Sequence, residues 1–169
     1  MTKLYAYVGP VEIRTRIGHS PGARILCLDD LLDWVRDSAQ RPGPDRLVAA
    51  TFVIDSTGGL WLADRRSEHV ACAGGRPVLS AGELFLLIER DRVEVAEVSN
   101  QSTGYCPEPE SWPTVAAALH HIGLAHPERF TTAVVFRRCE VCGERNIVKD
   151  GWFVCVICGA DLPDEWNFA

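Results

Sequence analysis

Two copies of the pattern Cys-x-x-Cys-Gly constrain this chain more than any other feature of its sequence. They are CEVCG at residues 139–143 and CVICG at residues 155–159. A spacing of two residues lets one tight turn aim both thiols at the same point, and the glycine that follows can adopt the positive φ that such a turn needs. We therefore expect all four thiols, those of Cys139, Cys142, Cys155 and Cys158, to hold one tetrahedral metal ion.

Four thiolates in tetrahedral geometry are typical of structural Zn²⁺, and a site with four protein ligands has no open position for a substrate. A redox dithiol uses one Cys-x-x-Cys at a helix start, while an iron–sulfur centre is a further alternative. Residues 137–160 resemble the zinc ribbons, a resemblance that implies two metal-binding knuckles joined by a short β-arm. Strands at 146–148 and 151–154 are expected to form this arm around an Asp-Gly corner, Asp150-Gly151.

The other cysteines and the charge bear on location and partners. The odd number of cysteines, seven, and the expected reducing compartment both argue against a disulfide framework. Gly9 and Pro10 interrupt the apolar start of the chain, and no apolar run approaches the roughly 20 residues of a membrane helix. A net charge of −6 argues against nucleic acid and anionic membranes as partners. We expect a cytoplasmic protein that binds zinc and contacts a protein or a small molecule.

The remaining sequence predicts an α+β domain over residues 1–136, with a mostly antiparallel sheet and two or three helices. The composition of the whole chain, 47% hydrophobic and 24% charged, is that of a protein able to bury a core. The RPGP sequence makes 41–46 a candidate sub-boundary, because two prolines end any helix there. The zinc ribbon would occupy residues 137–160 and a tail residues 161–169, whose Trp166 and Phe168 we expect to dock on the main domain.

Individual elements follow from periodicity and breakers. Alternating apolar runs separated by STGG predict a hairpin of Leu47–Asp55 and Leu60–Asp64. Further strands are predicted at 82–89 and 93–99. A helix over 31–40 would begin after an aspartate pair acting as cap, and another would begin at Ser111. Cys27, inside an apolar run, is expected in the core.

Two polar segments follow predicted strands in the middle of the chain. The first spans residues 64–75 and the second residues 99–112. Polar groups that cluster after strand ends are where pockets are often built. If both segments face one cleft, their side chains could bind a nucleotide-like or other anionic small molecule. The candidate ligand-binding residues are Arg65, Arg66, Glu68, His69, Asn100, Ser102 and Tyr105.

A structural interpretation of the same residues stays open. The charged side chains would then form solvated ion pairs of little energetic value, and His69 would bond a buried carbonyl group. Asn100 and Ser102 would stabilise their own loop by side-chain-to-backbone hydrogen bonds.

The middle region also resembles the non-IQ core of plant IQ-motif calmodulin-binding proteins over residues 52–125. The matching residues are His69, the sequence Ala-Gly-Gly at 73–75, Ala-Gly-Glu at 81–83, and then Ser102, Gly104, Tyr105 and Pro107. The resemblance implies a shared β-rich domain and no reaction. The chain has no IQ motif, so calmodulin binding is not carried over.

Two classes of function remain from the sequence. The first is a zinc-binding protein without catalytic activity that acts through protein contacts or ligand sensing; it is favoured because the chain has no P-loop, GxSxG, HExxH or dinucleotide-binding motif. The second is an enzyme acting on an anionic small molecule through the 64–75 and 99–112 segments.

Overall fold

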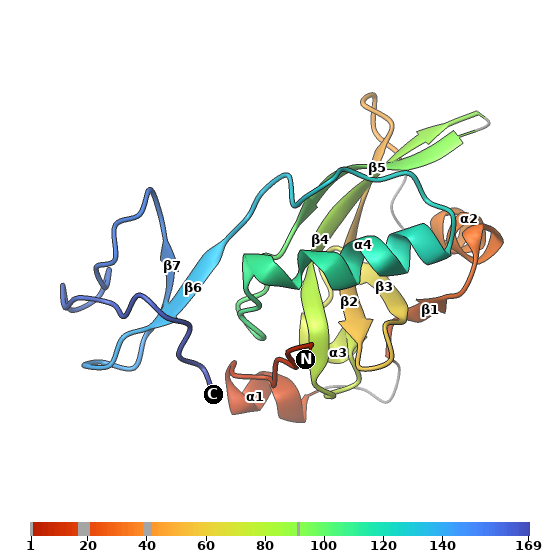
Figure 1. Ribbon diagram of the computed structural model, residues 1–169. Helices are drawn as coiled ribbons and strands as arrows, with labels where there is room; N and C mark the ends of the chain where they lie inside the picture. The colour runs from red at the N-terminus through yellow and green to blue at the C-terminus, as the bar shows by residue number, and fades with distance from the viewer. Residues whose placement is uncertain (1, 17–20, 39–41, 91) are drawn as a thin grey trace.

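The computed structural model describes residues 2–16, 21–38, 42–90 and 92–169, which form an α+β architecture (Figure 1). The helices in this part of the chain are α1 (Val11–Thr15), α2 (Leu28–Asp37), α3 (His69–Cys72), the 3₁₀ turn η1 (Pro109–Ser111) and α4 (Trp112–His121). The strands are β1 (Ala23–Ile25), β2 (Leu47–Asp55), β3 (Leu60–Asp64), β4 (Val78–Glu89), β5 (Arg92–Ser99), β6 (Val135–Arg138) and β7 (Arg145–Val148).

The main sheet has five antiparallel strands in the order β1-β3-β2-β4-β5. The β2–β3 hairpin closes at the pair Ile54 and Leu60, where the amide of Asp55 donates to the carbonyl of Gly59 at 2.9 Å. Gly58 supplies the positive φ, +84°, that this turn requires. The predicted hairpin is confirmed, with the residue bounds that the sequence indicated.

The core lies on both faces of this sheet, because side chains alternate between faces along each strand. Phe52 belongs to the larger cluster, which also holds Leu119 of α4 and Leu31 of α2. Its neighbour Val53 belongs to a second cluster with Tyr105. In Figure 1, α4 crosses one face of the sheet and α3 lies near its lower end. Strand β2, buried on both sides, is the centre of the fold.

Some predicted bounds differ from the structure. Strand β4 begins at Val78, four residues earlier than predicted, and it needs Gly82 because a Cβ there would lie 1.9 Å from the carbonyl oxygen of Ser99. The predicted helix 31–40 runs instead over Leu28–Asp37, and residues 39–40 lie outside the described residues. Cys27 occupies the N-cap position and is exposed, so its predicted core placement is wrong.

A local hydrogen bond accompanies the earlier helix start. The carboxylate of Asp30 accepts the amide proton of Leu26 at 2.8 Å, between the end of β1 and the first turn of α2. Both aspartates of the predicted cap therefore lie inside the first turn of α2. A negative charge there still stabilises the helix, through its interaction with the helix dipole. The start at Ser111 is close to the prediction, but its hydroxyl bonds Ser80 at 2.9 Å rather than capping α4.

The carboxyl-terminal part contains a separate two-stranded sheet of β6 and β7. The predicted arm of 146–148 with 151–154 is wrong in its pairing, because β7 pairs along its whole length with β6. Only the bridge between Lys149 and Trp152 remains of the expected arm, around an Asp150-Gly151 corner with φ of +52° and +69°. The strand that pairs with β7 is therefore β6, which precedes Cys139 in the chain.

The tail docks on the main domain, as the sequence predicted for its two aromatic residues. The indole N–H of Trp166 donates to the carbonyl of Cys106 at 2.7 Å. Phe168 is buried with Phe136 of β6 and Cys106. One apolar cluster thus joins the small sheet, the tail and the 99–112 segment.

Candidate metal centre

Each Cys-x-x-Cys-Gly copy folds into the same tight turn, which we call a knuckle. In the first knuckle, residues 139–144, the amide of Gly143 donates to the carbonyl of Cys139 at 2.9 Å and the amide of Cys139 to that of Glu144 at 2.8 Å. The second knuckle, residues 155–160, repeats both bonds with the same lengths. Gly143 and Gly159 have φ of +77° and +73°, so the predicted role of the glycines is confirmed.

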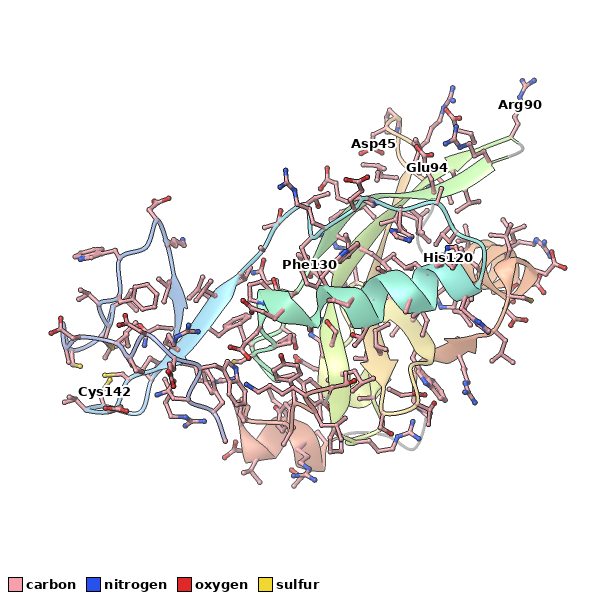
Figure 2. The ribbon with its side chains drawn as sticks, viewed as in Figure 1. Asp45, Arg90, Glu94, His120, Phe130 and Cys142 are labelled. Atoms are coloured by element: carbon pink, nitrogen blue, oxygen red, sulfur yellow. The ribbon has the colours of Figure 1, made fainter. Side chains whose placement is uncertain are left out.

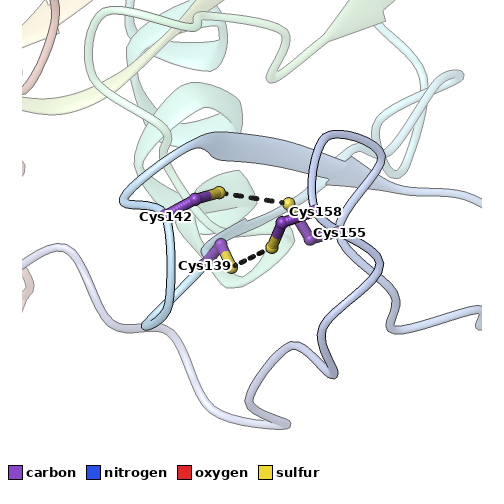
Figure 3. Close-up of side chains that lie close together, drawn as sticks. All are labelled: Cys139, Cys142, Cys155 and Cys158. Atoms are coloured by element: carbon purple, nitrogen blue, oxygen red, sulfur yellow. Dashed lines mark hydrogen bonds between the residues drawn. The ribbon is translucent and has the colours of Figure 1, made fainter.

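The two knuckles bring four sulfur atoms together (Figure 3). All four Sγ atoms lie within 4.8 Å of one another, with 3.5 Å between Cys139 and Cys158 and between Cys142 and Cys155. A tetrahedral ion with bonds of about 2.3 Å to sulfur requires sulfur–sulfur distances of about 3.8 Å. Disulfide bonding would require about 2.05 Å, and the thiols are free. The cluster is therefore consistent with a zinc-ribbon-like metal site.

The main chain of each knuckle favours the thiolate form of its first cysteine. Amide groups of Cys142 and Val141 lower the pKa of Cys139, and this effect exceeds that of burial. The amides of Cys158 and Ile157 act likewise on Cys155, whose pKa falls to about 6. Because the thiolate is the metal-binding form, these amides favour metal binding by Cys139 and Cys155. The amide of Glu144 acts likewise on Cys142, but burial and the neighbouring thiols outweigh it and raise the pKa of Cys142 to about 12. The amide of Ala160 lowers the pKa of Cys158, but the thiol of Cys139 and burial outweigh it, so this pKa is also raised.

Asn146 of β7 links the two knuckles beneath the sulfur atoms. Its side-chain oxygen accepts the amide proton of Val156 at 3.0 Å. Its side-chain nitrogen donates to the carbonyl of Glu144 at 3.0 Å and lies 3.5 Å from the sulfur of Cys155. Asn146 is 2% exposed, so these bonds are shielded from water. The sequence did not single out Asn146, although asparagine is depleted in strands and its presence in β7 is a signal.

Arg137 and Asn167 fix the tail to the small sheet. The guanidinium of Arg137 donates to main-chain carbonyls of Phe136, Pro163 and Asp164 at 2.6–3.1 Å. The Asn167 side chain makes a pair of bonds of 2.8 Å with the main chain of Arg138. The strand that leads into the first knuckle is thereby held on its outer side.

The first group of polar candidates gathers around the start of α3. Arg65 and Arg66 are exposed in the turn after β3, and Glu68 is an exposed N-cap without a side-chain capping bond. His69 begins α3, and its Nε2 lies 2.9 Å from the carbonyl oxygen of Gly82. Burial lowers the pKa of His69, which keeps the ring neutral. The bond to Gly82 agrees with the structural interpretation of His69.

The second group of candidates is buried. Asn100 donates to the carbonyls of Pro107 and Val134, each at 2.8 Å, and accepts the amide proton of Val134 at 2.7 Å. The hydroxyl of Tyr105 donates to the carbonyl of Arg76 at 2.7 Å. Ser102 is 1% exposed, and its hydroxyl has no hydrogen-bond partner among the described residues. Ligand binding by either group stays a prediction.

Fold and site together define an α+β protein with a four-cysteine, zinc-ribbon-like cluster near its carboxyl end. Comparisons of the chain with models of known families, with curated proteins and with solved structures give no match. No family match therefore supports the resemblance to zinc ribbons or the resemblance to the IQ-motif proteins. Within the described residues, no helix combines the length and the apolar character needed to cross a membrane.

Proposed function

We propose that the four cysteines bind one structural Zn²⁺ and that the protein acts through contacts with other proteins. The observation that carries the zinc proposal is the convergence of four free thiols within 4.8 Å. Thiolate ligands favour Zn²⁺ over the harder divalent ions. With all four positions taken by Cys139, Cys142, Cys155 and Cys158, the ion has no site for a substrate, so its role is to fold the two knuckles.

On this proposal residues 137–160 are a zinc ribbon attached to a domain of residues 1–136, and residues 161–169 fasten the two together. The bonds of Arg137 and Asn167 and the burial of Phe168 support that role for the tail. A ribbon held this firmly presents its knuckles in a fixed orientation. Fixed presentation favours an interaction or sensing module, and the acidic balance of the chain argues against nucleic acid as its partner.

The alternative of an enzyme acting on an anionic small molecule has weaker support. It requires free polar groups in the 64–75 and 99–112 segments. Asn100, Tyr105 and His69 each bond main-chain groups already. Arg65, Arg66 and Glu68 are exposed, and the hydroxyl of Ser102 has no partner among the described residues but is buried. A thermal-shift screen with nucleotides and other anions distinguishes the enzyme from the interaction module. Thermal stabilisation by an anion that is lost when Arg65 and Arg66 are replaced by Gln would favour the enzyme.

Metal analysis tests the proposal directly. We expect protein purified without a metal-binding tag to contain one zinc ion per chain. Inductively coupled plasma mass spectrometry measures this content. Replacing Cys142 and Cys158 by Ser should remove the metal and destabilise the ribbon. Cys27→Ser is the matched control, because Cys27 is likewise exposed but lies outside the cluster. Zinc-free wild-type protein, or full zinc in the double variant, would refute the proposed centre.

A further inference from the structure

We propose that the two knuckles form a docking surface for a protein segment in which an apolar side chain is flanked by lysine or arginine. The inference rests on the proposed zinc site and names the kind of partner that this site would serve. We call its apolar part the knuckle patch, made of Val141, Val156 and Ile157.

The knuckle patch is apolar where the turn itself demands no apolar residue. The two residues between the cysteines are exposed in both knuckles, so a polar side chain would be accommodated there. Three of these four positions carry Val141, Val156 and Ile157, which are 75%, 77% and 67% exposed. Such side chains gain by leaving water, so grouped and exposed apolar residues mark interaction sites.

The grouping follows from the metal site. All three side chains lie within one residue of a ligand cysteine, and the four sulfur atoms are within 4.8 Å of one another. In Figure 2 the labelled Cys142 lies at the far end of the ribbon, away from α4 and the main sheet. All three residues are also branched at Cβ, so their side chains are stiff and lose little rotamer freedom on binding.

The surroundings of the patch are negative, which determines the charge of the partner. Exposed carboxylates of Glu140 and Glu144 belong to the first knuckle and that of Asp161 directly follows the second, and the ion pairs within the described residues do not include them. A loaded site adds further negative charge, because four thiolates outweigh one divalent cation. Of the neighbouring cations, Arg145 donates to the carbonyl of Thr103 and Arg138 lies over the ring of Phe168, whereas Lys149 is next to Asp150 in the chain and offsets its charge. The complementary partner is therefore basic and apolar, and the phosphate backbone of nucleic acid is repelled.

Peptide selection on the full zinc-loaded chain tests this inference. A random library of 12-residue peptides displayed on phage would be selected on the wild-type protein. The triple variant Val141→Ser, Val156→Ser, Ile157→Ser serves for counter-selection. We expect the enriched peptides to place Leu, Ile or Phe beside Lys or Arg, and a synthesised peptide to bind the triple variant at least tenfold more weakly.

Two further variants distinguish peptide binding at the knuckle patch from non-specific hydrophobic binding and from binding by charge alone. Substituting Leu4, Val11 and Leu26 by Ser removes three apolar side chains of similar exposure elsewhere, so peptide affinity should stay within twofold of wild type. The pair Glu140→Lys and Glu144→Lys keeps the apolar patch and should weaken binding at least fivefold. Zinc content and thermal unfolding are measured on every sample, so a variant that fails to fold is recognised.

The outcomes distinguish this inference from the proposed function. Zinc-loaded protein that yields no peptides dependent on the knuckle patch would overturn the inference and leave the zinc centre intact. Peptides without basic residues, or equal loss of binding in the control triple variant, would overturn it as well. Patch-dependent peptide binding by protein that holds no zinc would instead overturn the proposed function alone, and absence of both zinc and binding would refute the two together.

Discussion

Asn146→Ala is the substitution that tests most sharply how the fold holds the four cysteines. The side chain joins the knuckles by bonding the amide of Val156 and the carbonyl of Glu144, both at 3.0 Å, next to the sulfur of Cys155. Alanine leaves the four thiols in place and removes only these links. We therefore expect zinc to bind still, with lower affinity.

The size of the effect follows from the bonds that are lost. Two buried hydrogen bonds to main-chain groups contribute about 0.5–1.5 kcal/mol each, or about 1–3 kcal/mol together. Removing a residue that orients a metal ligand costs about tenfold to hundredfold in metal affinity, which corresponds to about 1.4–2.8 kcal/mol. Both estimates agree, so the zinc dissociation constant of Asn146→Ala should rise by about tenfold to hundredfold.

Competition with a chromophoric zinc chelator at neutral pH measures this change. Asn167→Ala is the matched control, since Asn167 also makes two side-chain bonds to the main chain but touches no knuckle; it should destabilise the tail and leave zinc affinity within twofold. Asn146→Asp keeps the acceptor for Val156 but places a negative charge beside the thiolate of Cys155, so it should bind zinc at least as weakly as the alanine variant. Wild-type affinity in Asn146→Ala would refute the argument.

Two further predictions concern the main domain. Asn100→Ala leaves three buried main-chain groups unpaired at about 1–3 kcal/mol each, so urea unfolding should show a loss of at least about 3 kcal/mol; a loss below about 1 kcal/mol would contradict the structural role. Burial raises the pKa of Asp55, but hydrogen bonds led by those from Thr57 and Trp61 outweigh it and lower the pKa from 3.8 to about 2. The native state favours the carboxylate, so its stabilisation is complete above about pH 4 and is lost as the pH falls through 2; Asp55→Asn should flatten this part of the stability profile in urea unfolding, and an unchanged profile would exclude Asp55 as the cause.

Local sequence rules worked where the decisive interactions are between near neighbours. The β2–β3 hairpin depends on a turn of a few residues, and the bonds of Asp55 to that turn are local. The same holds for the knuckles, in which each glycine and each amide bond lies within six residues of chain. Cys27 shows the limit of such rules, because a residue in an apolar run is the exposed N-cap of α2, next to the bond in which Asp30 accepts the amide proton of Leu26.

By itself the sequence determined the four-cysteine cluster and the antiparallel α+β class, because cysteine spacing, apolar alternation and turn residues act over short distances. Only the tertiary structure decided that β7 pairs with β6, and that Asn146 and Arg137 support the site. It also placed Asn100 and Tyr105 in the interior. These features depend on which distant segments meet, and a buried polar side chain is recognised only when the main-chain groups that satisfy it are known.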